Sequence, residues 1–340
     1  MNYIHKDESA LYYECGYSCD NAIFLKLGSE SFFLTDGRYE IEAREQVSNS
    51  VEVIIDRDII KRANRLLRKS GITKCSYDPK EWSCFDFAKI SKNSDIKWKK
   101  KLYLSHKKRI IKSTPEIELL EMAVDTGRIG FERAKELFLV SGIGEDEYKL
   151  KRLAREAMSD YGKFELSFEP IIAIGANASK PHATPTDDEL GFGDLLLMDA
   201  GVKFASYCSD RTRTINFVEG FDWDERQKFT SPKLQRIYDT VQKAHDKAIK
   251  KARVGMRAKD IDKIAREVIE KAGFGKYFVH STGHGVGLDI HEMPYISPRD
   301  KTIIEDGMVF TIEPGIYLEG KFGVRIEDMV VMENGRAKVL

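Results

Sequence analysis

The chain has little of what marks a membrane, secreted or nucleic-acid-binding protein. No apolar run in its 340 residues approaches the length needed to cross a bilayer. Its five cysteines, an odd number without regular spacing, do not form a disulfide framework. The 55 basic and 55 acidic residues are interspersed, so no long-range field favours nucleic acid or an anionic membrane. The first residues carry charges where a secretory signal would be apolar. We therefore expect a cytoplasmic protein without a membrane or nucleic-acid partner.

One basic segment, Lys97 to Lys112, departs from this even distribution of charge. Taken alone it would suggest nucleic-acid binding, but the neighbouring segments restore neutrality. We interpret it as a solvated strand and linker between two domains. A helix start follows at Ser113-Thr114-Pro115-Glu116, with hydroxyl caps, a proline in the first turn and an acid near the N-terminus. We therefore expect one domain over residues 1–112 and a second over residues 113–340.

The two expected domains differ in how strands and helices alternate. In residues 1–112, apolar strands at 22–27, 31–35 and 51–55 alternate with helical patterns, which predicts a compact α/β domain. In residues 113–340, strand pairs lie between and after helices, which predicts an α+β domain with a curved, mainly antiparallel sheet. The first helix is expected to begin at 113, to run through about 138 and to end near Gly142, and further helices are expected at 145–161, 231–253 and 258–272.

Four carboxylates of the second domain lie in strand-like apolar stretches. They are Asp199, Asp210, Glu313 and Glu327. Carboxylates are rarely buried unless they pair with a cation or bind a metal. His284 lies between the two acidic pairs in GHGVG, where glycines allow the backbone to approach other groups closely. These five side chains form a ligand set for two divalent cations, whose positive charge would balance the four acids.

The alternative is that each acid pairs with an arginine. The candidates are Arg211, Arg213 and Arg325. Side chains alternate across a strand, so Arg325 shares a face with Glu327, whereas Arg211 and Arg213 lie on the face opposite Asp210. We interpret Arg211 and Arg213 as structural ion-pair partners. Because four acids and a glycine-flanked histidine occur together, we favour the metal site.

His280 either supports the metal ligands or merely lies near them, and the other five histidines fall into two groups. His182 and His291 lie in polar, proline-marked loops, which commonly carry binding and catalytic groups. His5, His106 and His245 lie outside any cluster. We expect these three to be surface or capping residues.

The chain resembles a known family, the metallopeptidases with the pita-bread fold, and within it the Xaa-Pro peptidases. The resemblance rests on MDAG…YCSDRTRT, HSTGHGVGLDIHE, TIEPGIY and GVRIEDMV, in the family order and spacing. The segments LYYECGYSCDNAIFLKL and FFLTDGRYEIEA also resemble the non-catalytic domain of aminopeptidase P, prolidase and creatinase. Methionine aminopeptidases normally lack such a domain, and creatinase lacks the full ligand set. The resemblance implies a creatinase/prolidase-like N-terminal domain followed by a pita-bread catalytic domain.

The resemblance also implies which residues bind metal. Asp199 would bind the first metal ion, and Asp210 and Glu327 would bridge both ions. His284 and Glu313 would complete the ligands of the second. Of the divalent ions, manganese is expected, with cobalt, zinc and iron as alternatives.

Catalytic and substrate-binding roles follow from the same resemblance. His182 and His291 would hold the substrate and stabilise the tetrahedral intermediate. Glu313 would pass a proton from water to the leaving nitrogen. Tyr295 and Arg325 are expected to contact the substrate.

The expected reaction is hydrolysis of the Xaa-Pro bond in a small peptide with proline at its second position. Some prolidases carry an arginine in the HExPxI segment that binds the dipeptide's carboxylate, and this chain has Tyr295 there. We therefore favour an Xaa-Pro aminopeptidase, with an Xaa-Pro dipeptidase as the alternative and Arg299 as a candidate replacement cation. A non-catalytic pita-bread module that binds protein or RNA is a more distant alternative. Because relatives are often dimers, we expect a homodimer.

Overall fold

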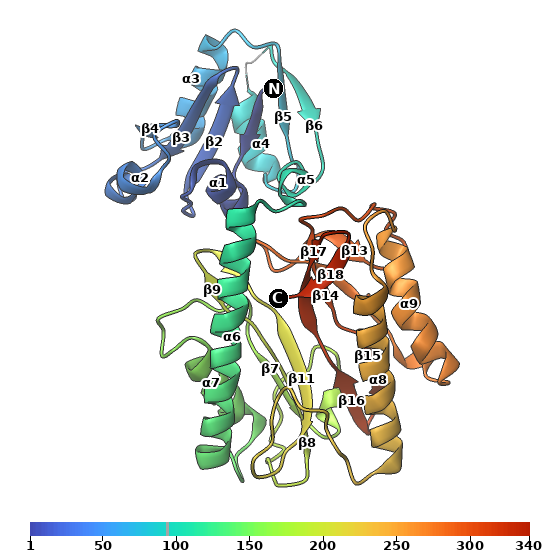
Figure 1. Cartoon of the computed structure of the whole chain (residues 1–340). Coiled ribbons are helices and arrows are strands. Elements are labelled where there is room, and N and C mark those ends of the chain that lie inside the picture. The colour runs from blue at the N-terminus through green and yellow to red at the C-terminus, as the bar shows by residue number, and fades with distance from the viewer. Residues whose placement is uncertain (93–94) are drawn as a thin grey trace. The chain divides into compact units, whose positions relative to one another are not determined.

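The computed structural model describes residues 1–92 and 95–340, which divide into two compact units, Met1–Arg109 and Ile110–Leu340. Figure 1 shows the elements of each unit. Each unit has apolar clusters of its own. Among the described residues, no helix is both long and apolar enough to span a membrane.

The first unit is built on one mixed sheet of six strands in the order β4-β3-β2-β1-β5-β6. Strand β1 pairs antiparallel with β2 and parallel with β5, and the outer pairs β3–β4 and β5–β6 are parallel. The strands are β1 (Tyr3–His5), β2 (Ala22–Leu27), β3 (Glu30–Thr35), β4 (Glu52–Ile55), β5 (Lys74–Tyr77) and β6 (Lys97–Lys100). The helices are α1 (Glu8–Cys15), α2 (Glu40–Gln46), α3 (Ile59–Lys69), α4 (Cys84–Ser91) and α5 (His106–Arg109). The expected α/β domain is confirmed.

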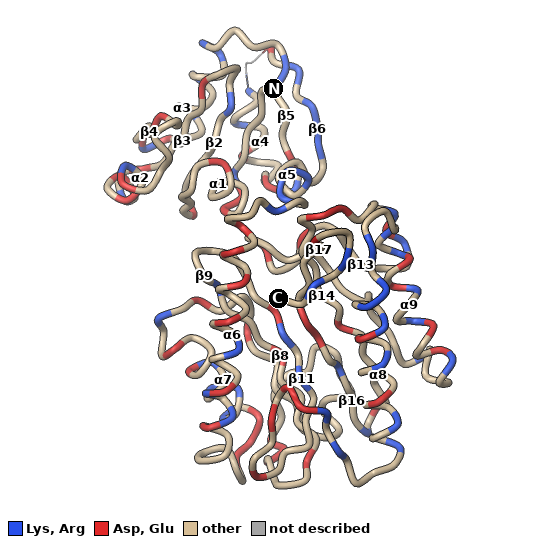
Figure 2. Tube along the Cα trace, in the orientation of Figure 1, with Lys and Arg blue, Asp and Glu red and all other residues tan. Residues whose placement is uncertain are grey.

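The basic segment is in part an exposed edge strand. Strand β6 lies at the sheet edge with its three lysines exposed, and Figure 2 shows basic residues along β6 and α5. Lysines on an edge strand oppose pairing with other chains. The end of the segment departs from the expected solvated linker, because Arg109 and Lys112 are buried.

The second unit contains four long helices and antiparallel strands. The helices are α6 (Thr114–Ser141), α7 (Glu147–Met158), α8 (Pro232–Lys251) and α9 (Ala258–Lys271), with short 3-10 turns η1 (Asn177–Ser179) and η2 (Gly275–Tyr277). One sheet has the order β11-β8-β7 and the other β13-β12-β14-β17-β18, and β9–β10 and β15–β16 form separate pairs. The expected α+β domain with mainly antiparallel strands is confirmed.

The strands of this unit have the following bounds: β7 (Ile171–Ile174), β8 (Leu195–Ala200), β9 (Lys203–Phe204), β10 (Tyr207–Cys208), β11 (Arg211–Asn216), β12 (Gly283–Gly285), β13 (Glu292–Ile296), β14 (Val309–Ile312), β15 (Gly315–Leu318), β16 (Phe322–Arg325), β17 (Asp328–Glu333) and β18 (Arg336–Val339). Helix α6 begins with the expected capping box, in which Ser113 and Glu116 satisfy each other's backbone groups. It ends at Ser141 with Gly142 as its C-cap, as the sequence predicts.

Strand β8 is buried on both faces, which explains its continuous apolar sequence. Leu196 and Met198 pack in the cluster that includes residues of α6 and α7. Leu195 and Leu197 belong to the cluster that includes residues of α8 and α9. Asp199 shares the alternating face of Leu195 and Leu197 at the end of this rigid strand.

Two histidines expected at the surface are buried instead. His5 is 0% exposed and its Nδ1 lies 2.9 Å from Glu81 Oε1. His245 is 4% exposed and its Nε2 lies 3.2 Å from Asp328 Oδ2. In both cases the partner is far away in the chain, so local sequence pattern does not reveal it.

Candidate metal centre and active site

One cavity of about 560 Å³ in the second unit brings together the residues that the sequence singled out. Its lining includes His182, Asp199, Asp210, His284, His291, Tyr295, Glu313, Arg325 and Glu327. These residues come from segments far apart in the chain, and the antiparallel strands bring them to one place. His280, Phe168 and Ile171 line the cavity as well.

Strand pairing positions the first two acids. Asp199 of β8 lies opposite Thr212 of β11 in the register. Asp210 directly precedes β11, so it comes close to Asp199 across the same pair of strands. Both acids are buried, as the apolar surroundings in the sequence predict.

The other ligand candidates lie at the ends of neighbouring strands. Glu313 directly follows β14, and its backbone N–H donates to the carbonyl of Thr282, at 2.7 Å. His284 lies in β12, which pairs with β14. Glu327 lies between β16 and β17, and its N–H donates to Thr212 O at 3.1 Å. The backbone at each of these residues is therefore fixed by pairing or hydrogen bonds with a neighbouring segment.

Three of these side chains converge closely enough to share one ion. Asp210, His284 and Glu327 each offer a ligand atom within 4.8 Å of the others. His284 Nε2 also lies 3.5 Å from Glu313 Oε1. The other ring nitrogen, Nδ1, is 3.1 Å from the carbonyl of Gly285, which can only accept, so Nε2 is left with its lone pair toward the acids.

Without a bound cation, burial and mutual repulsion disfavour the ionised form of these acids. Burial raises the pKa of Asp210 well above its ordinary value, and the charge of Glu327 raises it further. Burial likewise raises the pKa of Glu327, together with the charges of Glu313 and Asp199. Burial raises the pKa of Glu313 to about 8. Burial lowers the pKa of His284 to about 3, so its imidazole is neutral. Bound divalent cations would reverse this preference for neutral acids.

The two carboxylate oxygens of Asp199 differ in their hydrogen bonds. Its Oδ2 accepts from Arg325 Nη2 at 2.5 Å. Its Oδ1 is buried and accepts no hydrogen bond from the residues that the structure describes. A buried carboxylate oxygen without a donor, beside other acids and a neutral imidazole, fits a divalent cation. The donor set therefore fits the metal ions expected from the sequence.

Arg325 is expected to contact the substrate, but its guanidinium N–H groups donate hydrogen bonds to other residues of the protein. Besides the bond to Asp199, its Nε donates to Thr212 Oγ1 at 3.0 Å and its Nη1 to Tyr317 Oη at 2.9 Å and Pro181 O at 3.1 Å. It is 3% exposed. Arg325 lines the cavity and hydrogen-bonds to Asp199, Thr212 and Tyr317, while its contact with substrate stays a prediction.

Two polar residues next to the ligands were not singled out from the sequence. Thr212 Oγ1 donates to Glu327 Oε2 at 2.6 Å, and Tyr317 Oη lies 2.9 Å from His280 Nε2. The available signal was even spacing, since Thr212 follows Asp210 by two positions on a strand. The space for Tyr317 depends on Gly315, where a Cβ would lie 2.5 Å from the tyrosine Oη.

Replacement of Tyr317 by phenylalanine is expected to destabilise the metal-free protein by about 1–3 kcal/mol, because the buried Arg325 loses an acceptor. Thermal unfolding measures this. Tyr148→Phe, at a tyrosine that is 57% exposed, is the matched control and should leave the midpoint unchanged. Equal midpoints for Tyr317→Phe and wild type would show that the hydroxyl does not stabilise this network.

Comparison with known proteins places these residues in a family context. Residues 118–334 match the sequence pattern of metallopeptidase family M24. Over 232 residues the chain is 41% identical to the Xaa-Pro dipeptidase of Pyrococcus furiosus, which covers 68% of this chain and 63% of that protein. The sequence match thus spans less than two thirds of that relative's length.

Solved structures extend the likeness to almost the whole chain. The Xaa-Pro dipeptidase from Bacillus anthracis aligns with a TM-score of 0.89 at 28% identity, covering 99% of this chain and 92% of that one. The X-Pro aminopeptidase from Thermotoga maritima aligns with a TM-score of 0.87, also at 28% identity, covering 99% of this chain and 94% of that one. Both units therefore have the arrangement of elements expected from the resemblance.

Proposed function

The chain belongs to metallopeptidase family M24, and from this premise we propose that it is a metal-dependent Xaa-Pro dipeptidase. The observation that carries the proposal is the convergence of Asp210, His284 and Glu327 in the cavity that Asp199 and Glu313 also line. That all five expected ligands line one cavity supports the proposal. It argues against a non-catalytic binding module, for which these ligands would have no use.

The comparisons support the dipeptidase better than the aminopeptidase favoured by the sequence. The Pyrococcus furiosus relative and the Bacillus anthracis structure are both named Xaa-Pro dipeptidases. Tyr295 lies on the cavity wall, where an arginine would bind the substrate carboxylate in some prolidases. Arg299 lines an adjoining cavity that shares His280 and Ser281 with the site, so a cation is available nearby. The aminopeptidase stays the second candidate because of Tyr295 and the Thermotoga maritima structure.

In the proposed mechanism, Asp199, Asp210, His284, Glu313 and Glu327 hold two metal ions. Bound metal ions would lower the pKa of a water molecule so that hydroxide is available near neutral pH, and would polarise the scissile carbonyl. Manganese is the proposed metal because carboxylate oxygens dominate the set. The strand ends keep the acids in place, which limits the reorganisation that binding requires.

Other side chains of the cavity would move protons and stabilise charge. Glu313 would take the proton of the attacking water and deliver it to the proline nitrogen, because an unprotonated amide anion is a very poor leaving group. Burial lowers the pKa of His291, so His291 is neutral near pH 7. A neutral imidazole N–H can donate to the carbonyl oxygen as negative charge develops there. We propose this role for His182 and His291.

Cleavage of a matched pair of peptides tests the substrate assignment. Metal-stripped protein re-supplied with Mn²⁺ is expected to cleave Ala-Pro at least about tenfold more efficiently than Ala-Pro-Ala-Ala, because one charge-assisted hydrogen bond to the dipeptide carboxylate is worth that much. Equal or better cleavage of the longer peptide would indicate an aminopeptidase. Cleavage of neither peptide would contradict both candidates.

The remaining expectations stay predictions. These are the homodimer, the cytoplasmic location, the absence of a nucleic-acid partner and the choice of manganese over cobalt, zinc or iron. The proposed substrate is a small peptide with proline at its second position.

A further inference from the structure

We propose that Arg213 is a positioning residue for Glu327, acting from the side of the strand opposite the metal cavity. The proposal rests on the proposed metal site. Thr212 and Arg213 are consecutive in β11, and their side chains point to opposite faces. Thr212 Oγ1 donates to the Glu327 carboxylate at 2.6 Å, whereas Arg213 Nη1 donates to the Glu327 backbone carbonyl at 2.6 Å. Arg213 Nη2 donates to Asp328 Oδ1 at 2.7 Å.

The backbone at Glu327 depends on these contacts because it lies between two strands. Strand β16 ends at Arg325 and β17 begins at Asp328. The N–H of Glu327 donates to Thr212 O at 3.1 Å, and its carbonyl accepts from Arg213. Both backbone groups of Glu327 are therefore satisfied by β11. A carboxylate that is to bind a metal ion must be held within about 0.5 Å of its working position. These two contacts fix the backbone from which the Glu327 side chain extends.

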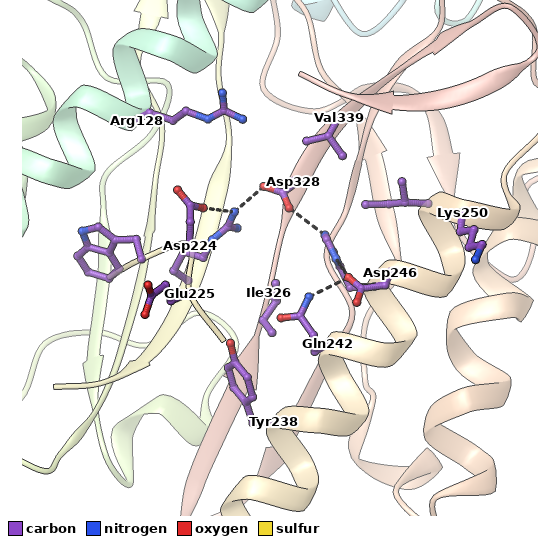
Figure 3. A pocket seen from close by; sticks show the side chains of 14 residues that line it. Arg128, Asp224, Glu225, Tyr238, Gln242, Asp246, Lys250, Ile326, Asp328 and Val339 are labelled. Atoms are coloured by element: carbon purple, nitrogen blue, oxygen red, sulfur yellow. Dashed lines mark hydrogen bonds and ion pairs between the residues drawn. The ribbon is translucent and has the colours of Figure 1, made fainter. Parts of the chain in front are cut away.

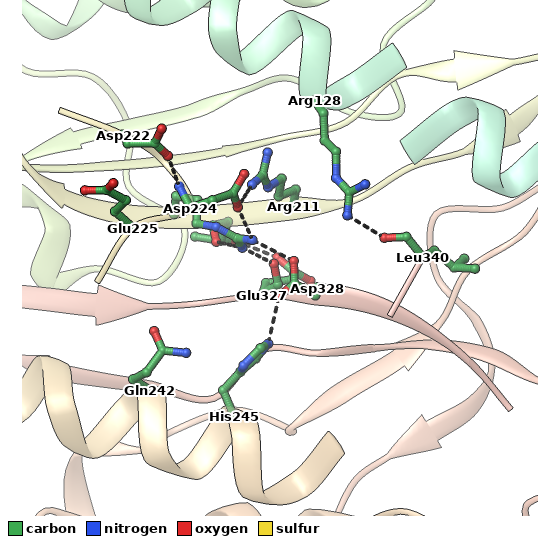
Figure 4. Close-up of polar contacts among 12 residues, drawn as sticks. Arg128, Arg211, Asp222, Asp224, Glu225, Gln242, His245, Glu327, Asp328 and Leu340 are labelled. Atoms are coloured by element: carbon green, nitrogen blue, oxygen red, sulfur yellow. Dashed lines mark hydrogen bonds and ion pairs between the residues drawn. The ribbon is translucent and has the colours of Figure 1, made fainter. Parts of the chain in front are cut away.

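Arg213 is itself fixed by a buried network. Its side chain is 12% exposed, and Asp328 also meets His245 of α8, whose Nε2 lies 3.2 Å from Asp328 Oδ2. Figure 4 shows His245 reaching toward Asp328, with Glu327 beside it. The two oxygens of Asp328 thus face a guanidinium from β11 and an imidazole from α8. Charge-assisted bonds of this kind are short and directional.

The network lies outside the cavity in which substrate is proposed to bind. Asp328, His245, Arg213 and Asp224 line a separate cavity of about 460 Å³, shown in Figure 3. Glu327 lines the metal cavity instead, because adjacent side chains of an extended chain point to opposite faces. An effect of Arg213 on the metal would therefore reach it through Glu327 and not through contact with substrate.

Arg211 provides a matched control on the same strand face. Its side chain is 10% exposed, against 12% for Arg213, and both arginines pair with Asp224. Arg211 hydrogen-bonds to Asp224 but to neither Glu327 nor Asp328 within the described chain. The two arginines thus differ chiefly in the contact that the proposal concerns.

The test compares Arg213→Met and Arg211→Met. Metal-free protein of each variant is titrated with Co²⁺, and binding is measured by calorimetry and by visible absorption. Arg213→Met is expected to weaken Co²⁺ binding by about 10- to 100-fold, the usual effect of losing a residue that orients a metal ligand, and to change the Co²⁺ spectrum. In the loaded enzyme kcat should fall while KM for Ala-Pro stays the same. Arg213→Lys should be intermediate, since lysine lacks the fixed fork that makes both bonds. Arg211→Met should keep the wild-type affinity and spectrum.

Several results would overturn the proposal. Wild-type Co²⁺ affinity in Arg213→Met would do so, as would an equal loss in Arg211→Met, which would indicate general destabilisation. If Arg213→Met does not fold, His245→Leu removes one contact of Asp328 and should weaken Co²⁺ binding by about tenfold. An unchanged affinity in that variant would also overturn it. Wild-type protein that binds no Co²⁺ in the cavity would contradict the proposed function together with this inference.

Discussion

Glu327→Gln is expected to remove metal binding from the site and to lower kcat/KM for Ala-Pro by about 10³-fold or more. The substitution keeps the shape of the side chain, so the bond from Thr212 can still form. A neutral amide, however, is a weak ligand and leaves one positive charge of the metal ions unbalanced. Metal content per chain, measured by mass spectrometry of the eluted protein, and steady-state kinetics would record both effects.

The same variant separates metal loss from unfolding. Glu327 adds to the repulsion that raises the pKa of Asp210, so its replacement should leave the metal-free protein at least as stable as wild type. Glu333→Gln, at an exposed acid on β17, is the control and should retain metal and activity. Wild-type turnover by Glu327→Gln protein would refute the assigned role of Glu327.

Lys112→Met is expected to destabilise the second unit by about 3–5 kcal/mol, because it removes the buried cation that pairs with the buried Glu292 carboxylate. Lys112 Nζ and Glu292 Oε1 are 2.5 Å apart, and both side chains are 1% exposed. For a unit of this size the loss corresponds to a fall in melting temperature of about 6–20 °C. Glu292 begins β13 and follows His291, so the pair also fixes one edge of the cavity. Differential scanning calorimetry measures the change.

The double variant Lys112→Met/Glu292→Gln tests whether the loss of stability comes from burying one charge of the pair without the other. Removal of both charges should restore much of the lost stability, since neither charge of the pair then has to be buried. Lys301→Met, at an exposed lysine of the same unit, should have little effect. If Lys112→Met lowers the melting temperature no more than Lys301→Met, the buried pair does not stabilise the fold.

Local patterns in the sequence are enough to predict most elements and to single out the acids and the histidine that line one cavity. The helix start at Ser113 depends only on residues next to it in the sequence. The continuous apolar run of β8 indicates that both faces of this strand are buried. The ligand candidates stood out because acids in apolar strands are unusual. Two-residue alternation predicts that Arg325 and Glu327 share a face, and both line the cavity, although Glu327 lies just outside the strands.

The contacts that the sequence did not reveal join residues far apart in the chain. Lys112 and Glu292 are 180 residues apart, and nothing local marks this lysine of a basic segment as buried. His245 likewise gains its partner, Asp328, only when α8 packs beside β17. Peptide-length preference was inferred from Tyr295 alone, although a carboxylate can be bound by a cation from any element that borders the cavity. The dipeptidase proposed above rests on the names of the relatives and not on this residue.

Metal reconstitution tests the central claim most directly. Metal-stripped protein should cleave no Ala-Pro, and activity should rise with added Mn²⁺ until two ions are bound per chain, the number proposed for this ligand set. Activity and binding, followed in one titration by kinetics and calorimetry, should saturate together. Cleavage of Ala-Pro by protein free of metal, or full binding of two ions without any cleavage, would contradict the assignment of this cavity as a metallopeptidase active site.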